Sequence, residues 1–282
     1  MIFHEYSLIF FTVLAQTAVG GYLLVSARAL TQGYTLAKIN RVKIPMFALW
    51  ALMGLGFLFS TTHLGSPLRA FNAFNQLGSA WLSNEVFFGA AFFAVGGTQW
   101  LLSALNRGSL GLQKALMVIA MLLGAIFMYS MVKVYMINTV PTWFNIYTPL
   151  SFLMTMAVAG LLLFQLVISA SKDINAATSK EIALIALLVV IASLFVTIGK
   201  ADLITNIQTS AFNAIELVEG VSFYFSAQIV LLIAGFAVWV LPLFTPLSIK
   251  PTSQLTLALV LVLSSELIGR GLFYSLHMTV GL

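Results

Sequence analysis

The sequence contains no cysteine among its 282 residues, and only 7% of its residues are charged. The absence of cysteine excludes disulfides, thiolate-bound iron–sulfur clusters and thiolate zinc sites within this chain. About a quarter of the residues of a soluble domain are charged, so this chain has too few charges to cover a surface that faces water. Its 61% hydrophobic residues and mean hydropathy of +1.04 instead indicate a membrane protein with several spans.

The few charged residues indicate neither a nucleic-acid-binding protein nor a cleaved signal peptide. The net charge is +5, but no basic run and no nucleic-acid-binding motif is present, so nucleic acid is not an expected partner. The start of the chain contains His4 and Glu5 but neither lysine nor arginine, whereas a signal peptide begins with a basic segment. The apolar run that follows is also too long, and we interpret it as the first membrane span.

Eight apolar stretches are long enough to cross a bilayer as helices, which takes about 20 residues each. They cover residues 6–30, 44–63, 84–105, 114–136, 148–170, 182–199, 221–243 and 253–276. The alternating pattern of a membrane β-barrel is not found. We therefore expect residues 1–282 to form a single integral-membrane domain, an all-α polytopic bundle of eight transmembrane helices surrounded by the lipid bilayer.

The lysines and arginines predict the orientation of this bundle. The connections after the first, third, fifth and seventh spans hold Lys38, Arg41, Lys43, Arg107, Lys172, Lys180 and Lys250. The opposite connections hold Arg69 and Lys200. Because connections rich in lysine and arginine stay in the cytoplasm, both termini are expected on the outer side of the membrane.

The ionisable residues inside or beside the spans gather toward the outer side. In chain order they are His63, Glu85, Lys133, Glu266, Arg270 and His277. Such groups are costly in a bilayer and usually face the interior of the bundle or a wet cavity. The sequence therefore predicts a polar pocket that opens toward the outer side.

Four of these residues have simpler explanations. Lys133 can extend its ammonium group to the interface. Glu266 and Arg270, one helical turn apart, can form a structural ion pair within their own helix. His277 lies close to the C-terminus and can be an ordinary interfacial residue.

His63 and Glu85 form a more specific pattern. Gly65 is placed to take the left-handed conformation that ends a helix, so the His63 imidazole is expected at a defined helix end. Glu85 is expected in the first turn of the next helix, with Ser83 or Asn84 as its N-cap. A carboxylate there is also favoured by the helix dipole, so Glu85 could simply cap this helix.

Three functions are compatible with this pattern. Imidazole accepts a proton near neutral pH, so the pair could bind a quinol and take up its protons. The same groups would suit a proton-coupled transporter, although transporters favour polar groups at the bilayer midplane. A purely structural anchor is the third.

We expect no haem, because a bis-histidine site would require His63 and His277 to meet and no span has a central histidine. Electrons from a quinol would then pass to a partner subunit with metal centres.

Six segments along the chain match the pattern of one protein family. They are WALMGLGF at residues 50–57, HLGSPLRAFN at 63–72, LSNE at 82–85, VGG at 95–97, VPTW at 140–143 and ELIGRGLFYSLHMTVG at 266–281. In these segments the sequence closely resembles the membrane anchor subunit of anaerobic dimethyl sulfoxide reductase. The segments are colinear with the family from the first span to the last residues.

The resemblance implies an eight-helix protein of the bacterial inner membrane with both termini periplasmic, acting in anaerobic respiration and electron transport. Its implied partners are a molybdopterin catalytic subunit and a four-cluster iron–sulfur subunit. Its implied substrate is menaquinol, which is oxidised to menaquinone while electrons pass to the iron–sulfur subunit. No haem, iron–sulfur or molybdenum cofactor is expected in this chain itself.

The resemblance also assigns residues to the quinol site. By their motifs, His63 and Glu85 map onto the histidine and glutamate of the family's quinol site, and Arg69 maps onto a position that borders it. We expect His63 to accept a proton from the quinol hydroxyl and Glu85 to take up a proton or relay it outward. Arg69 is expected to stabilise the developing anionic quinone species or to hold the loop in place. Further candidates for quinol binding are Gly65, Lys133, Arg270 and His277.

Overall fold

The computed structural model describes residues 5–32, 35, 41–62, 72–172, 176–208, 213–243 and 251–279. Within these ranges the regular structure is helical, apart from one isolated bridge between Gln208 and Asn213. The predicted all-α fold is therefore confirmed for the described part of the chain.

The described ranges contain long helices joined by short connections. They are α1 (Tyr6–Thr31), α3 (Phe47–Thr61), α4 (Trp81–Ala104), α5 (Leu110–Tyr135), α6 (Tyr147–Ala170), α7 (Ala176–Asn206), α8 (Val221–Val240) and α9 (Pro251–Ser275). Two short 3-10 helices, η2 (Ala214–Leu217) and η3 (Leu241–Leu243), lie before and after α8.

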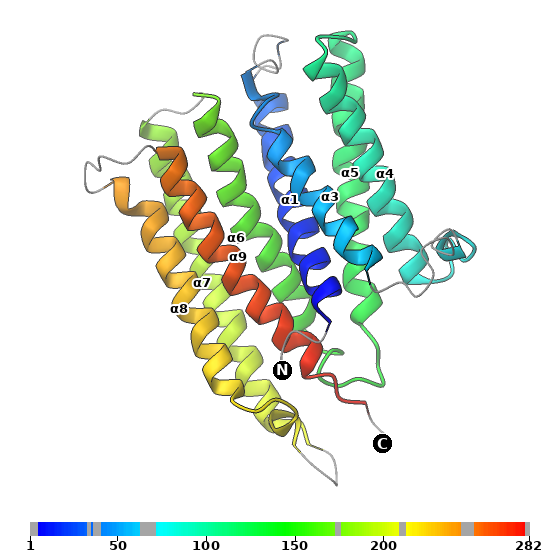
Figure 1. The fold of residues 1–282 in the computed structure, drawn as a ribbon, viewed down its shortest axis with the longest axis vertical. Coiled ribbons are helices and arrows are strands. Elements are labelled where there is room, and N and C mark those ends of the chain that lie inside the picture. Colours follow the sequence, from blue (N-terminus) through cyan, green and yellow to red (C-terminus); the bar gives the residue numbers. More distant parts are fainter. Residues whose placement is uncertain are drawn as a thin grey trace.

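Seven of these helices are long and apolar enough to cross a membrane. The exception is α3, whose 15 residues fall short of a full span. The predicted second span, residues 44–63, and with it the total of eight spans, therefore stay predictions. Successive helices run in alternating directions, and both chain ends lie at the same end of the bundle (Figure 1). We call this the terminal end.

Several predicted boundaries differ from the observed helix ends, among them the starts of α5 at Leu110 instead of residue 114 and of α7 at Ala176 instead of residue 182. Helix α4 begins at Trp81 rather than at residue 84. Helix α7 continues to Asn206 instead of stopping at residue 199, because Ile204, which is buried, extends its apolar face past Lys200. Lys200 therefore belongs to a helix and not to the connection that was expected to begin there.

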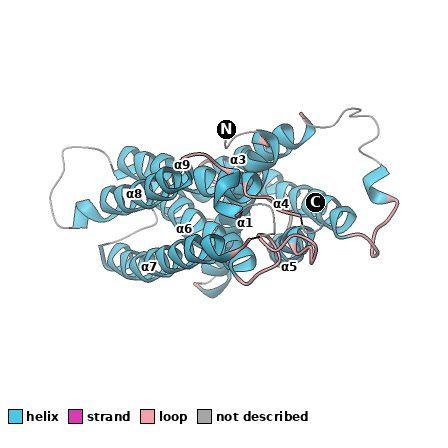
Figure 2. Ribbon diagram, turned by 90° about the horizontal axis from the view of Figure 1, so that it is seen from below, coloured by secondary structure: helices cyan, strands magenta, loops and turns pink. Residues whose placement is uncertain are grey.

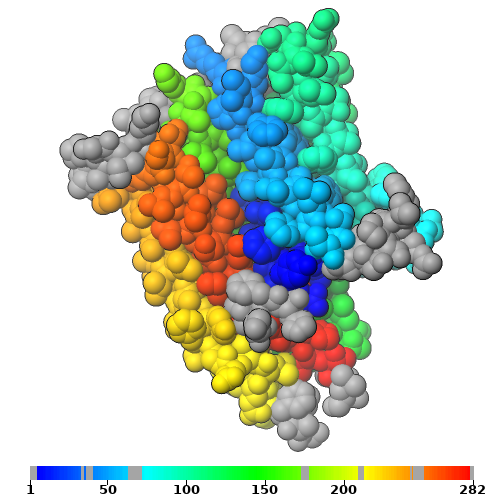
Figure 3. Space-filling view, viewed as in Figure 1, coloured from blue at the N-terminus to red at the C-terminus, as the bar shows by residue number. Residues whose placement is uncertain are grey.

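The helices form two groups of four with the same packing order. In the first group α1 packs against α3 and α5, and α4 packs against α5; in the second, α6 packs against α7 and α9, and α8 packs against α9. Helices α1 and α6 join the groups at the centre (Figures 1 and 2). Helix α9 also touches α1, and Figure 3 shows the two together on one face.

The central contact depends on small residues. A Cβ added at Gly160 in α6 would lie 2.7 Å from the Cα of Gly20 in α1, a distance that carbon atoms cannot adopt without clashing. Glycine at both positions therefore lets the two backbones touch, as small residues do between membrane helices.

The outer faces of the bundle are apolar, as expected for contact with lipid. Large hydrophobic side chains such as Leu58, Phe195 and Phe223 are mostly exposed. By contrast, α1 and α6 are buried along most of their length. Polar side chains on the central helices consequently face protein rather than lipid, and the candidate site includes several of them.

Candidate functional site

Glu85 lies in α4, near the terminal end of the bundle, and its side chain is only 3% exposed. It is the fifth residue of the helix, and the first turn contains no acidic residue. The prediction that Glu85 lies in the first turn was therefore wrong, because the helix begins earlier than expected. Its Oε1 atom is buried and has no hydrogen-bond partner among the described residues. A carboxyl group in this state is stabilised by binding a proton or a hydrogen-bond donor.

Asn84 has a different role from the predicted N-cap. The N-cap position of α4 is Ala80, which offers no side-chain acceptor. The Asn84 side-chain oxygen instead accepts a hydrogen bond of 2.7 Å from the backbone N–H of Gly78, a residue with a φ of +86°. Asn84 thus fastens the preceding turn onto the helix that carries Glu85.

Two buried tyrosines from different helices bind each other. The hydroxyl of Tyr274 in α9 donates a hydrogen bond of 2.6 Å to the hydroxyl of Tyr135 in α5, and both side chains are buried. This hydrogen bond between two buried hydroxyls joins α5 and α9.

Three predicted site residues, His63, Gly65 and Arg69, lie outside the described residues. The described part of the chain stops at Thr62, the C-cap of α3, and resumes at residue 72, shortly before α4. The segment that carries these three residues therefore connects the terminal-end tips of α3 and α4. Their proximity to Glu85 stays a prediction.

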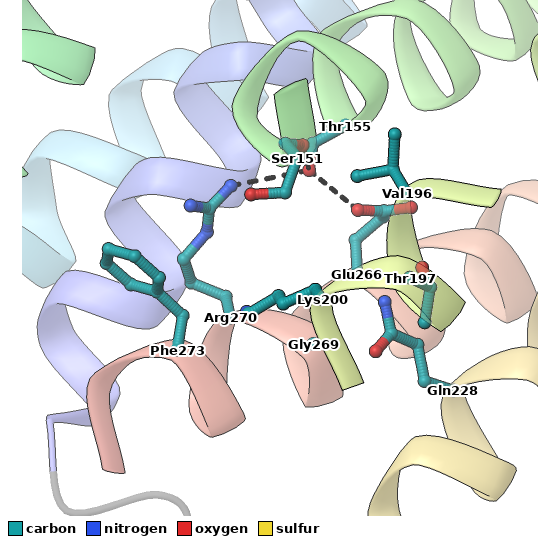
Figure 4. A pocket seen from close by; sticks show the side chains of 10 residues that line it. All are labelled: Ser151, Thr155, Val196, Thr197, Lys200, Gln228, Glu266, Gly269, Arg270 and Phe273. Atoms are coloured by element: carbon teal, nitrogen blue, oxygen red, sulfur yellow. Dashed lines mark hydrogen bonds between the residues drawn. The ribbon is translucent and has the colours of Figure 1, made fainter. Parts of the chain in front are cut away.

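Glu266 and Arg270 project from α9 into the bundle. The Thr155 hydroxyl of α6 lies between them, donating a hydrogen bond of 2.6 Å to Oε2 of Glu266 and accepting one of 3.3 Å from Nη2 of Arg270 (Figure 4). The same Arg270 nitrogen donates to Oε1 of Gln16 in α1 at 3.0 Å. The guanidinium also stacks 3.6 Å from the ring centroid of Phe152. The hydrogen bonds of these two residues therefore run to neighbouring helices, and the Thr155 hydroxyl lies between them where a direct ion pair within α9 was expected.

A small cavity lies beside Glu266, between α6, α7, α8 and α9 (Figure 4). Its volume is about 20 Å³. Its polar lining comes from Ser151, Thr155, Thr197, Lys200, Gln228, Glu266 and Arg270. A Cβ added at Gly269 would clash with the amide of Gln228, so glycine at this position allows that amide to reach the cavity.

Lys133 and His277 lie apart from this cavity. The Lys133 ammonium lies 5.8 Å from the ring centroid of Trp81 and 5.6 Å from that of Tyr129, on the rim of two surface grooves of about 400 and 600 Å³. The exposed His277 ring lies 4.6 Å from that of Trp143. These positions agree with the interfacial explanation of both residues.

Sequence reasoning missed several members of the buried polar cluster. Lys200 is 8% exposed but was assigned to a connection, because a charged residue was taken as the end of a span. A signal for the α9 members was present: Glu266, Arg270 and Tyr274 recur every four residues, which places them on one helix face. Gln16 and Thr155 gave no such signal, since their partners are distant in the sequence.

The described residues contain no group of three or more histidine, cysteine or acidic residues that could hold a metal ion. Comparison with known proteins then identifies relatives. Residues 1–276 match the family model of the DMSO reductase anchor subunit (DmsC). Over 281 residues the sequence is 40% identical to an anaerobic dimethyl sulfoxide reductase chain of Escherichia coli, covering 99% of this chain and 97% of the relative.

Two further relatives match over nearly their whole lengths. The anaerobic dimethyl sulfoxide reductase chain YnfH of Escherichia coli is 40% identical over 279 residues, and an anaerobic dimethyl sulfoxide reductase chain of Haemophilus influenzae is 35% identical over 280 residues. In both cases the alignment covers 99% of this chain and 97% of the relative.

Proposed function

The chain belongs to the family of dimethyl sulfoxide reductase anchor subunits, and on this basis we propose that it oxidises menaquinol for the reductase complex. As an anchor subunit, it is a multi-pass protein of the bacterial inner membrane, with catalytic and electron-transfer partners. We propose that the electron-transfer partner is a four-cluster iron–sulfur subunit and the catalytic partner a molybdopterin subunit. Menaquinol would be the substrate of this chain and menaquinone its product.

The observation that carries this proposal is the buried carboxyl group of Glu85. One of its oxygens has no partner among the described residues, and it lies in the helix that follows the segment containing His63 and Arg69. A quinol hydroxyl placed beside it would supply the missing hydrogen bond. A buried carboxyl group that only capped a helix would be expected to bind backbone N–H groups of the first turn, and Glu85 lies beyond that turn.

The proposed reaction assigns a role to each group. Menaquinol loses two protons and two electrons as it becomes menaquinone. His63 accepts one proton as a general base, since imidazole can do so near neutral pH, and Glu85 accepts the other. Arg69 stabilises the anionic quinone species between the two electron transfers. The electrons leave to the iron–sulfur subunit, and both protons leave to the periplasm.

The proposed orientation places both termini in the periplasm. It counts α3, with residues that precede it, as the second span, which makes eight spans in all. Its support is the distribution of basic residues. Four basic residues lie at or next to helix ends on the side of the bundle opposite the terminal end: Arg28, Lys43, Arg107 and Lys114. The positive-inside rule assigns that side to the cytoplasm. Glu85 and the proposed quinol site then lie near the periplasmic surface.

The test compares quinol and dye as electron donors to the assembled complex. Glu85→Gln, which keeps the shape of the side chain, and His63→Ala should each lower the rate with a menaquinol analogue by about 100-fold or more, the usual contribution of a general base. With a dye that bypasses the membrane subunit, both variants should match wild type. Glu219→Gln, which changes an exposed carboxyl group near the same end, is the control and should leave both rates unchanged.

Two results would contradict the proposal. In the first, Glu85→Gln and His63→Ala both keep the wild-type rate with quinol and with dye. These residues would then be structural, and the quinol site would lie elsewhere. An equal loss with quinol and dye, in proportion to the amount of assembled complex, would mean that these residues support assembly rather than quinol oxidation.

A further inference from the structure

A groove opens on the outer surface of the bundle between α5 and α6, where the two groups of four helices meet. Helix α5 packs mainly against α4, whereas α6 packs mainly against α1, α7 and α9. The volume between α5 and α6 is about 400 Å³, and it is lined by Leu23 of α1, Met128 of α5, and Met156 and the exposed Leu153 of α6. We call this the α5–α6 groove, and the proposed reaction assigns no role to it.

The lining of the α5–α6 groove is almost entirely apolar. Its polarity therefore suits a hydrocarbon chain. Inside a bilayer, however, an apolar surface alone does not distinguish one membrane lipid from another, because lipid tails are as apolar as the side chains that they touch. Selectivity must come from a polar group at the edge of the groove. Among the described lining residues, Lys133 alone carries a charge.

Lys133 lies in the last turn of α5, close to the terminal end of the bundle. Its ammonium lies beside the exposed rings of Trp81 and Tyr129, at 5.8 and 5.6 Å from their centroids. Tryptophan and tyrosine gather at the depth of the lipid headgroups, so the ammonium lies at the depth of the lipid phosphates. No carboxylate of a described residue forms an ion pair with it, which leaves this positive charge available to a ligand.

A second, wider groove meets the first one at Lys133. Its volume is about 600 Å³, its lining includes Trp81, Asn138 and Phe144, and it shares Lys133 and Met136 with the α5–α6 groove. The helix dipole favours any cation near the C-terminal end of a helix, but it does not account for two grooves that meet at this one. Along its length the arrangement offers an apolar groove, then a positive charge, then a wider space with an amide.

We propose that the α5–α6 groove binds one anionic phospholipid, with an acyl chain against Leu23, Leu153 and Met156 and its phosphate on Lys133. The phosphate supplies the negative charge that the ammonium binds, and headgroup hydroxyls then reach the Asn138 amide in the second groove. A quinol headgroup carries no charge, so it complements Lys133 less well. Because a ligand that binds only the folded state stabilises it, the lipid strengthens the junction between α5 and α6.

The test uses two matched pairs of variants. Lys133→Gln removes the charge that binds the phosphate, and its control Lys114→Gln makes the same change at an exposed lysine near the other end of α5. Leu153→Trp fills the α5–α6 groove, and its control Leu122→Trp adds the same ring at an α5 position outside the lining. Both leucines are exposed, so the fold should tolerate both replacements.

Native mass spectrometry of the full chain, purified in detergent and titrated with phosphatidylglycerol or phosphatidylethanolamine, counts the lipids on the folded protein. Wild type should bind one phosphatidylglycerol more tightly than any further molecule and more tightly than phosphatidylethanolamine. Lys133→Gln should lower this first affinity about fivefold, the contribution of one lysine near an anionic lipid surface, and should cancel the preference. Leu153→Trp should lose the first site for both lipids, whereas both controls should match wild type.

Four results would overturn this inference. Equal binding of both lipids by wild type, or an unchanged affinity of Lys133→Gln, would mean that the lysine does not recognise a phosphate. An equal loss in Lys133→Gln and Lys114→Gln would reveal a general effect of surface charge. If a menaquinol analogue displaces phosphatidylglycerol from wild type one for one, the groove is a quinol site instead. The rates of Glu85→Gln with quinol and with dye test the proposed function separately.

Discussion

The adjacent glycines Gly96 and Gly97 in α4 should respond in opposite ways to replacement by alanine. A Cβ at Gly96 would lie 3.0 Å from Cζ2 of Trp50 in α3, and closer still to Cη2, whereas a Cβ at Gly97 would meet no heavy atom within 4 Å. The Trp50 ring has little room to move, because it is buried and its centroid lies 5.2 and 5.5 Å from those of Tyr22 and Phe92.

The expected magnitudes follow from these distances. Alanine in place of glycine stabilises a helix by roughly 0.5–1 kcal/mol, and Gly97→Ala should show this gain. Carbon atoms in contact prefer about 3.5–4.0 Å, so Gly96→Ala forces the ring or the helix to shift by about 0.5 Å or more. Overpacking of this kind costs about 1–3 kcal/mol, so Gly96→Ala should lower the free energy of unfolding despite its gain in helix propensity.

The assay is unfolding of the membrane protein in detergent micelles with increasing SDS, followed by the helical circular dichroism signal. Gly96→Ala is also measured together with Trp50→Leu, which removes the ring, and in that background the alanine should be tolerated. Equal effects of Gly96→Ala and Gly97→Ala, or an undiminished cost in the Trp50→Leu background, would refute the reasoning. The result bears on function, because α3 and α4 flank the segment that contains His63.

Two further replacements test single hydrogen bonds by the same unfolding assay. Asn84→Ala should cost about 0.5–1.5 kcal/mol because the N–H of Gly78 loses its acceptor, and Asn84→Asp, which keeps an acceptor, should cost less. Gln165→Leu should cost about 1–3 kcal/mol because it leaves the buried Nε1 of Trp239 without the oxygen that it binds at 2.6 Å. Adding Trp239→Phe should recover part of that loss, and a further loss would contradict the argument.

The membrane-spanning helices could be predicted from hydropathy because lipid requires long apolar stretches with all backbone hydrogen bonds made internally. The predicted stretch at residues 6–30 and the observed α1 differ by a single residue. The prediction failed at Lys200, because hydropathy treats a charged residue as the end of a span. The helix continues there since its other faces remain apolar and the lysine enters the bundle interior.

The candidate site was predictable only in part. Glu85 stood out because few carboxyl groups border the spans, and in the structure its side chain is buried near the terminal end. Its burial beyond the first turn was not predictable, because the start of α4 depends on the turn that Asn84 fastens. The neighbouring pair of Tyr135 and Tyr274 was also missed, since 139 positions separate the two residues in the sequence.

The sequence by itself determined the membrane class, the all-helical fold, the family and most helix positions, because each of these depends on local composition or on motifs read along one stretch of residues. Only the tertiary structure decided which polar groups meet. Gln16, Thr155 and Arg270 come from three helices and form one hydrogen-bonded set because α1, α6 and α9 pack together at the centre of the bundle. Such contacts depend on how helix faces are rotated and paired, which hydropathy along the sequence does not specify.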